Sequence, residues 1–271
     1  MSRIARRFAA LKQEGRGALI PYLEACDPDF QTSLDLLKAM PEAGADLIEI
    51  GMPFSDPSAD GPVIQLAARR GLKAGATLPR LFEMVKSFRE QDNDTPIILM
   101  GYLNPIEAYG IDRFCVDASA AGVDGLIIVD MPPEEAGPMQ GPAKAAGLDI
   151  IRLIAPTTDD NRLKLVLNHA SGFVYYVSIT GITGTRSASD EDLRAALPRI
   201  RAATDLPIAI GFGIRTPEQA ASASRIADGA VVASALLATL AKTLDPSEQA
   251  TPSTLPSVRT QLRELAAAVR A

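Results

Sequence analysis

The stretch Asp46-Leu-Ile-Glu-Ile50 is a short, largely apolar run, and the segment that follows it, Gly51-Met-Pro-Phe-Ser-Asp-Pro-Ser-Ala-Asp60, is rich in turn-forming residues. A short apolar run between turn signals is typical of a strand buried on both faces of a parallel sheet. Runs of the same kind recur along the chain. They predict eight strands, at residues 18–22, 46–50, 96–100, 125–129, 150–154, 173–178, 207–211 and 229–232.

Patterns with helical periodicity separate these strands, and several begin with a Ser, Thr or Asp that can cap a helix. They predict helices at residues 4–13, 31–42, 63–73, 78–89, 111–121, 134–146, 159–168, 190–203, 217–224, 234–244 and 258–270, with a flexible connection at 245–256 before the last. Eight strand-then-helix units in 271 residues indicate one α/β domain over 1–271, a single (β/α)8 TIM barrel with an extra N-terminal helix. A doubly wound open sheet is the main alternative, but the GxGxxG that usually follows its first strand is missing.

Composition limits the classes of function. The chain is 47% apolar and 22% charged, as in ordinary soluble globular proteins, and its net charge of −6 disfavours a nucleic-acid surface. Charged residues and glycines interrupt the apolar stretch near the N-terminus, so neither a signal peptide nor a membrane span is expected. Cys26 and Cys115 have no metal-ligand spacing, which favours buried thiols and a cytoplasmic location. The single histidine, His169, argues against a multi-histidine metal centre, and no metal is expected.

Two acidic residues stand out in the opening stretch. Glu49 lies within an apolar run, where an ionised carboxylate without a partner is unfavourable, so its pKa should be raised enough to carry a proton near neutral pH. Asp60 lies on a polar loop and should stay ionised, able to stabilise positive charge. Two structural alternatives remain open, namely an interior ion pair between Glu49 and Arg152 and an Asx-type loop cap at Asp60.

Glycine-rich segments follow two of the last three strands, at residues 180–185 and 211–214, and the dipeptide Ala233-Ser234 follows the third. In an α/β barrel such segments converge at the carboxyl end of the strands, where backbone N–H groups and a helix N-terminus bind phosphate. The sequence therefore indicates a phosphate-ester substrate. No lysine falls within a predicted strand, which disfavours a Schiff-base aldolase, and the presence of only one histidine weakens the case for a zinc-dependent aldolase. The reaction class that remains is carbon–carbon or proton-transfer chemistry driven by carboxylates.

Several motifs form a pattern along the chain, namely Ile20-Pro-Tyr22, the segment from Glu49 to Gln65, Met100-Gly-Tyr-Leu-Asn-Pro105, Val129-Asp-Met-Pro132, Ala155-Pro-Thr-Thr158, Gly181-Ile-Thr-Gly184 and Gly211-Phe-Gly213. Together they resemble the tryptophan synthase alpha chain family. The resemblance covers nearly the whole chain and is most specific from Glu49 to Gln65.

The resemblance implies a lyase that cleaves indole-3-glycerol phosphate to indole and glyceraldehyde 3-phosphate without a cofactor. It assigns Glu49 as the acid/base that protonates indole C3 and helps remove the glycerol hydroxyl proton, and Asp60 as the group that stabilises charge on the indole nitrogen. Thr183 would position Asp60. The phosphate contacts would be Gly184, Gly213 and Ser234. The apolar slot for indole would be lined by Tyr22, Met100, Tyr102, Ile127, Val129, Leu153, Tyr175 and Phe212.

The resemblance also implies a partner, a beta chain that receives indole in an alpha2-beta2 tetramer. Two positions depart from the family pattern, because Cys26 and Ala233 stand where glycine is usual. Two competing functions remain. The chain could be chiefly an interaction subunit that activates a partner, or another carboxylate-driven phosphosugar barrel such as an isomerase or epimerase, which needs no wide apolar slot.

Overall fold

The computed structural model describes residues 1–177, 189–211 and 213–271. Its strands form one parallel sheet in the order β5-β4-β3-β2-β1-β9-β8-β7-β6, in which consecutive strands pair from β1 to β5 and from β6 to β9, and β1 pairs with β9. The strands are β1 (Ala18–Glu24), β2 (Ile48–Gly51), β3 (Ile97–Gly101), β4 (Gly125–Ile128), β5 (Asp149–Ile150), β6 (Arg152–Ile154), β7 (Val174–Val177), β8 (Ile208–Gly211) and β9 (Gly229–Val232).

The two ends of this order meet in one segment of chain. The predicted strand 150–154 is divided at Ile151 into β5, which pairs with β4, and β6, which pairs with β7. The Ile151 backbone N–H still donates to the carbonyl of Leu126 on β4, at 2.9 Å. A single segment therefore contacts both ends of the sheet and brings the ring close to closure. The predicted barrel is confirmed, and the doubly wound open sheet is wrong.

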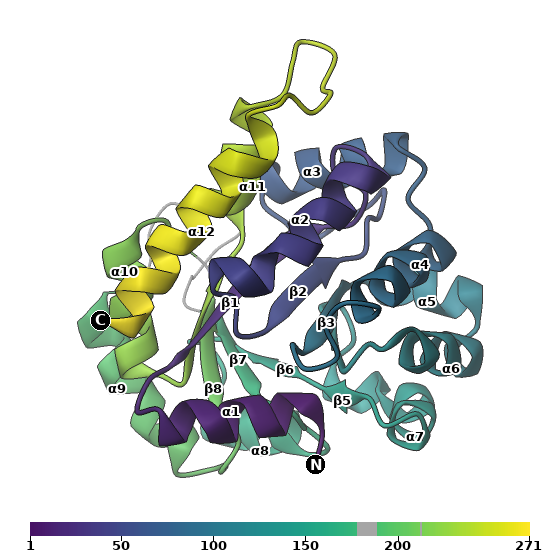
Figure 1. Ribbon diagram of the computed structural model, residues 1–271. Coiled ribbons are helices and arrows are strands. Elements are labelled where there is room, and N and C mark those ends of the chain that lie inside the picture. Colours follow the sequence, from purple (N-terminus) through teal and green to yellow (C-terminus); the bar gives the residue numbers. More distant parts are fainter. Residues whose placement is uncertain (178–188, 212) are drawn as a thin grey trace.

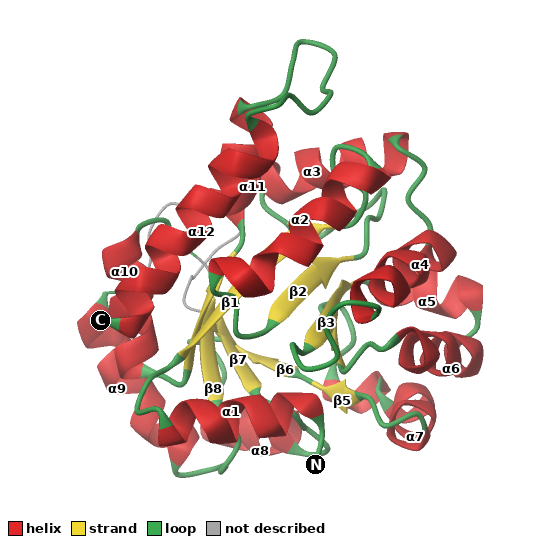
Figure 2. Cartoon of the chain, in the orientation of Figure 1, coloured by secondary structure: helices red, strands yellow, loops and turns green. Residues whose placement is uncertain are grey.

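Helices surround the strands on the outside (Figure 1 and Figure 2). Two of them begin with a reciprocal capping box, formed by Ser189 with Asp192 and by Thr216 with Gln219. The helices are α2 (Phe30–Ala43), α3 (Pro62–Lys73), α4 (Leu78–Arg89), α5 (Leu103–Tyr109), α6 (Ile111–Ala121), α7 (Gly137–Ala145), α8 (Asp160–Leu167), α9 (Asp190–Arg201), α10 (Pro217–Ile226), α11 (Ser234–Lys242) and α12 (Thr254–Arg270).

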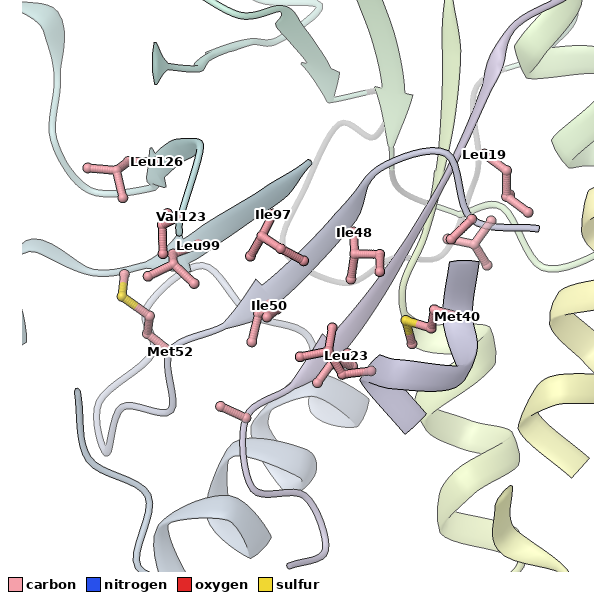
Figure 3. Packing of buried hydrophobic residues seen from close by; sticks show 14 of the residues in the cluster. Leu19, Leu23, Met40, Ile48, Ile50, Met52, Ile97, Leu99, Val123 and Leu126 are labelled. Carbon is pink, nitrogen blue, oxygen red and sulfur yellow. The ribbon is translucent and has the colours of Figure 1, made fainter. Parts of the chain in front are cut away.

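The hydrophobic core has two layers, because successive side chains of a strand point to opposite faces of the sheet. On β1, Leu19 and Leu23 face outward to the helices, together with Ile48 and Ile50 of β2 (Figure 3). The alternate residues belong to a second cluster inside the barrel, which includes Ile20. This alternation decides which residues of each strand are available for a site in the barrel interior.

Helix α1 (Arg3–Gln13) packs against the N-terminal end of the barrel. Ile4, Phe8 and Leu11 belong to the inner cluster, and the rings of Phe8 and Phe173 lie 5.7 Å apart. The expected extra N-terminal helix thus closes one end of the barrel. A ligand would enter from the carboxyl ends of the strands, where active sites of this architecture lie.

A buried ionic cluster around Asp46 holds this closed end together. The Asp46 carboxylate is fully buried, accepts hydrogen bonds from the backbone N–H of Leu19 at 2.9 Å and from Arg16 at 2.8 and 2.9 Å, and also contacts Arg7. Burial raises the pKa of Asp46, but these hydrogen bonds outweigh burial and lower it below its usual value. The cluster links the segment after α1 and the start of β1 to the start of β2.

We expect Asp46→Ala to lower the free energy of unfolding by about 3 kcal/mol at pH 7, because it leaves partly buried arginines and a buried N–H without a partner. Since the pKa of Asp46 is lowered in the folded state, its contribution is present above the pKa of the unfolded chain and is lost as pH falls through the folded value. Denaturant unfolding from pH 7 down to pH 3 should show the difference from wild type shrinking. The exposed Asp35→Ala is the control, with an effect within about 0.5 kcal/mol.

The structure corrects several predicted boundaries. Strand β1 runs two residues further, to Glu24, because Leu23 and Glu24 pair with Ile50 and Gly51. Helix α5 was not predicted; its Pro105 lies in the first turn, where proline is tolerated. The predicted helix 134–146 is a 3₁₀ turn (Pro133–Glu135) followed by α7. Helix α12 begins inside the predicted connection 245–256, at the buried Thr254.

Both cysteines are buried and unpaired, as predicted. In the described part of the chain no helix combines the length and apolar character needed to cross a bilayer. The same residues contain no group of three or more His, Cys, Asp or Glu side chains placed to hold a metal ion.

Candidate active site

Glu49 lies on the inner face of β2 and is fully buried. Strand register places it beside Tyr22 of β1 on one side and Ile98 of β3 on the other. Among the described residues, neither carboxylate oxygen has a hydrogen-bond partner. Burial alone raises the pKa of Glu49 to about 8. This agrees with the prediction that the Glu49 carboxyl carries a proton near neutral pH. No hydrogen bond among the described residues gives this buried acid a structural role.

The alternative of an ion pair between Glu49 and Arg152 is not supported. Arg152 alternates with Leu153, whose side chain packs with the inner cluster, and so points out of the barrel. Its Nη1 donates to the carbonyl of Met131 at 3.2 Å. No ion pair involving either residue occurs in the described part of the chain, so a structural role for Glu49 as the partner of an arginine has no basis.

Asp60 lies on the loop between β2 and α3 and is half-buried. Tyr102 holds this loop, because the backbone N–H of Ala59 donates to the Tyr102 hydroxyl at 3.0 Å and the rings of Phe54 and Tyr102 lie 5.5 Å apart. Burial raises the pKa of Asp60, and a hydrogen bond from the Tyr102 hydroxyl opposes that rise. The Asx-cap alternative is weakened by this contact, since the carboxylate interacts with a side chain of the site. The ionised state of Asp60 stays a prediction.

The residues expected to line an indole slot gather inside the barrel at its carboxyl end. Tyr22 and Tyr175 are both buried, and the Glu49 carboxyl contributes to the raised pKa of each. The Tyr175 hydroxyl lies over Gly211, where a Cβ atom would approach it to 1.9 Å. Of the other residues expected in the slot, Met100, Ile127, Val129 and Leu153 also belong to or pack against the inner cluster. Tyr102 lies just beyond, as the cap of α5 and the support of the loop after β2.

The structure describes only some of the residues that are expected to bind the phosphate group. Ser234 is exposed at the first position of α11, and no side chain of the described residues caps this helix end. Gly213 adopts φ +86°, a backbone conformation that side chains rarely tolerate, on the loop after β8. An uncapped helix N-terminus beside such a loop is suited to binding an anion. Thr183, Gly184 and Phe212 lie outside the described residues.

Sequence reasoning missed one acidic residue of this region, Glu24. It is 3% exposed and shares the inner face of β1 with Tyr22, whose hydroxyl donates to it. The prediction ended the first strand at Tyr22, so Glu24 was assigned to the following loop. The spacing Tyr22-Leu-Glu24 was the available signal, because residues two apart in a strand share a face.

Comparison with known proteins agrees with this geometry. A sequence model of the tryptophan synthase alpha chain family matches residues 8–269. The chain belongs to the tryptophan synthase alpha chain family. The expected assignment, to a lyase of tryptophan biosynthesis, is therefore confirmed.

Individual relatives support the assignment over the full length. The tryptophan synthase alpha chain of Gluconacetobacter diazotrophicus is 73% identical over 270 residues, which cover 100% of this chain and 98% of the relative. That of Gluconobacter oxydans is 71% identical over 271 residues, with 100% of both chains covered. Among solved structures, tryptophan synthase subunit alpha from Legionella pneumophila superposes with a TM-score of 0.90 at 38% identity, covering 99% of this chain and 98% of that one.

A further solved structure bears on assembly. A chain in the structure of Mycobacterium tuberculosis tryptophan synthase superposes with a TM-score of 0.87 at 36% identity, covering 100% of this chain and 99% of that chain.

Proposed function

We propose that Glu49 and Asp60 carry out the retro-aldol cleavage of indole-3-glycerol phosphate to indole and glyceraldehyde 3-phosphate by this member of the family. The supporting observation is a fully buried carboxyl with a pKa near 8 that has no hydrogen-bond partner among the described residues, on a strand whose following loop carries the second acid and is tethered by Tyr102. A group that titrates near the working pH both gives and takes a proton efficiently.

Glu49 acts first as an acid and then as a base. In its protonated form it gives its proton to indole C3, which leaves a positively charged indolenine ring and a carboxylate. That carboxylate then accepts the proton of the glycerol hydroxyl next to the scissile bond. As the hydroxyl oxygen becomes a carbonyl, the C3 bond to the side chain breaks and its electron pair returns to the ring. Both products leave and Glu49 is again protonated.

Asp60 stabilises the positive charge that forms on the indole nitrogen when C3 is protonated. As a carboxylate it accepts a hydrogen bond from the ring N–H, and this interaction strengthens as the charge develops. Tyr102 holds the neighbouring Ala59 and interacts with Asp60 itself, so the acid is oriented before the substrate arrives. The apolar inner cluster supplies flat walls for the ring, which an isomerase or epimerase acting on a phosphosugar alone would not need.

We assign phosphate binding to Gly184, Gly213 and Ser234 on the loops after the last strands. The α11 N-terminus supports this assignment, because its first N–H groups and its dipole favour a negative charge. For Thr183 we propose the expected role of positioning Asp60, and for Phe212 that of lining the slot for indole. No cofactor or metal enters the proposed reaction.

A spectrophotometric assay of indole release from indole-3-glycerol phosphate tests the activity. Turnover by the purified chain, together with binding of indole propanol phosphate, which lacks the cleavable hydroxyl, is the expected result. A chain that processes phosphosugars but does not bind the indole compound would instead support the isomerase or epimerase alternative.

We infer that the chain works with a beta chain that receives indole, in an alpha2-beta2 tetramer. The solved tryptophan synthase structure that this chain superposes on supports a partner. The loop that carries Asp60 is largely exposed at residues 55, 56, 58 and 59, so a protein bound at this rim would reach the catalytic acid directly.

Adding a beta chain should therefore raise indole release by the isolated chain, because binding at the rim restricts the Asp60 loop in its productive position. Titration of activity against the added beta chain measures this, and sedimentation gives the stoichiometry. Asp56→Ala, on the exposed part of the loop, should weaken the stimulation. Glu264→Ala, on the exposed side of α12, is the control and should leave it unchanged. Stimulation without any turnover by the isolated chain would favour the interaction-subunit alternative.

We also infer a single folding domain over 1–271, since the terminal helix α12 packs against α2 and α10 of the barrel. The cytoplasm remains the expected location, in keeping with two buried, unpaired cysteines.

A further inference from the structure

Tyr22 and Glu24 form a buried hydrogen-bonded pair inside the barrel. They are two residues apart on β1 and so share its inner face. The Tyr22 hydroxyl donates to Oε2 of Glu24 at 2.5 Å, and the two residues are 5% and 3% exposed. The mechanism proposed above uses neither the hydroxyl nor this acid, so their burial together needs a separate explanation.

The neighbouring strand leaves room for the pair. In the register between β1 and β2, Tyr22 lies opposite Glu49 and Glu24 lies opposite Gly51. A Cβ atom at Gly51 would lie 1.9 Å from the Tyr22 hydroxyl oxygen and 2.4 Å from Oε2 of Glu24. Any other residue at this position would displace one partner or the other. The glycine thus allows the hydroxyl and the acid to meet directly beyond Glu49.

The charges around Glu24 favour its protonated form. Burial raises its pKa well above the usual range, the carboxylates of Asp60 and Asp27 raise it further, and the hydrogen bond from Tyr22 and the charge of Arg70 lower it. Arg70 is already committed, because its Nε and Nη2 donate to the two oxygens of Asp27 at 2.6 and 2.9 Å. Among the described residues Glu24 has no ion pair of its own, so a neutral acid is the favoured state.

Tyr22 is adjacent to Glu49 across the strands, and both proposed catalytic acids act on its hydroxyl. The charges of Asp60 and Glu49 both contribute to the raised pKa of its hydroxyl. Its ring belongs to the inner cluster that forms the slot. A ring in this place affects how closely an indole approaches Glu49, and its hydroxyl is fixed by Glu24.

We propose that Glu24 is a positioning residue for the indole end of the site, whose neutral carboxylic acid holds the Tyr22 ring as one wall of the slot beside Glu49. This inference rests on the function proposed above. A neutral acid suits the task, because an ionised Glu24 would place a second negative charge beside Asp60 and disfavour the carboxylate that the reaction needs.

Affinity for indole propanol phosphate, measured by calorimetry, tests the positioning role. Glu24→Ala and Tyr22→Phe each remove the hydrogen bond and should weaken binding by about fivefold to tenfold, as the loss of one buried hydrogen bond implies. They should raise KM more than they lower kcat. The double variant should be no weaker than the poorer single one, since both changes remove the same interaction. Glu24→Gln keeps a neutral acceptor and should restore affinity to within about twofold of wild type.

The pH profile of kcat/KM tests the protonation state. If Glu24 is neutral where Asp60 titrates, Glu24→Gln leaves the acid limb where it is in wild type. A downward shift of that limb by more than about half a pH unit would mean that an ionised Glu24 raises the pKa of Asp60, and would overturn the proposal.

Controls separate the possible failures. Asp46→Ala, at the closed end of the barrel, lowers stability without touching the slot and should leave affinity unchanged. If wild type does not bind indole propanol phosphate, the proposed function fails. If wild type binds and Tyr22→Phe binds equally well, the positioning role fails. Tyr22→Phe keeps the ring and so remains informative if Glu24→Ala does not fold.

Discussion

Glu49→Gln should lower kcat by about a hundredfold or more, because general acid/base groups contribute at least that much and glutamine neither donates nor accepts the transferred proton at this step. The amide has nearly the same shape as the carboxylic acid, so affinity for indole propanol phosphate should stay close to that of wild type. Indole release measured at saturating substrate gives the change in kcat. Wild-type turnover in this variant would remove Glu49 from the mechanism.

The same variant tests the protonation state of Glu49. The folded-state pKa is about 8, raised by burial above the usual 4.5 of an exposed glutamate, so the folded protein binds this proton more tightly than the unfolded chain. The stability this confers is fully present below about pH 4.5 and is lost as pH rises through about 8. Glutamine carries no such dependence. The free energy of unfolding of Glu49→Gln, relative to that of wild type, should therefore rise by a few kcal/mol between pH 5 and pH 9. Denaturant unfolding at each pH measures this difference.

Wild-type activity should follow the same titration. The first step needs protonated Glu49, so kcat/KM should fall as pH rises above about 8. An alkaline limb that is still present in Glu49→Gln, measured on its residual activity, would show that another group is responsible.

Asp60→Asn is expected to lower kcat by about a hundredfold with ligand affinity largely kept, because the lost interaction strengthens only when positive charge develops on the indole nitrogen. Asparagine keeps the size of the side chain and a carbonyl acceptor, so the loop after β2 should keep its place against Tyr102. Comparison of kcat with the affinity for indole propanol phosphate separates the two effects.

Burial raises the pKa of Asp60, so the acid limb of wild-type kcat/KM should lie above the usual range of an aspartate, and Asp60→Asn should lose that limb. Asp56→Asn, on the exposed part of the same loop, is the matched control and should keep wild-type kcat in the absence of a partner. Unchanged turnover in Asp60→Asn would contradict the role assigned to this acid.

Much of the fold could be predicted from the local pattern of apolar and polar residues in the sequence. Helices 78–89 and 111–121 were predicted with the bounds observed for α4 and α6, because each combines clear periodicity with a clear end. Continuous apolar runs such as Asp46–Ile50 indicated strands buried on both faces, and their number indicated a barrel. Helix α5 was missed because Asn104 and Pro105 suggest a turn, although proline fits a first helical turn.

The sequence by itself determined the barrel, its extra helix and the burial of Glu49, because those depend on hydrophobic pattern along a few consecutive residues. Only the tertiary structure decided which side chains meet across strands. Arg152 was available in the sequence as a partner for Glu49, but alternation along β6 points it out of the barrel. Glu24 was assigned to a loop, yet β1 continues through it, register sets it opposite Gly51, and the Tyr22 hydroxyl donates to it. Pairing between strands depends on register and on the space left by neighbours, and neither is encoded in the residues next to an acid along the chain.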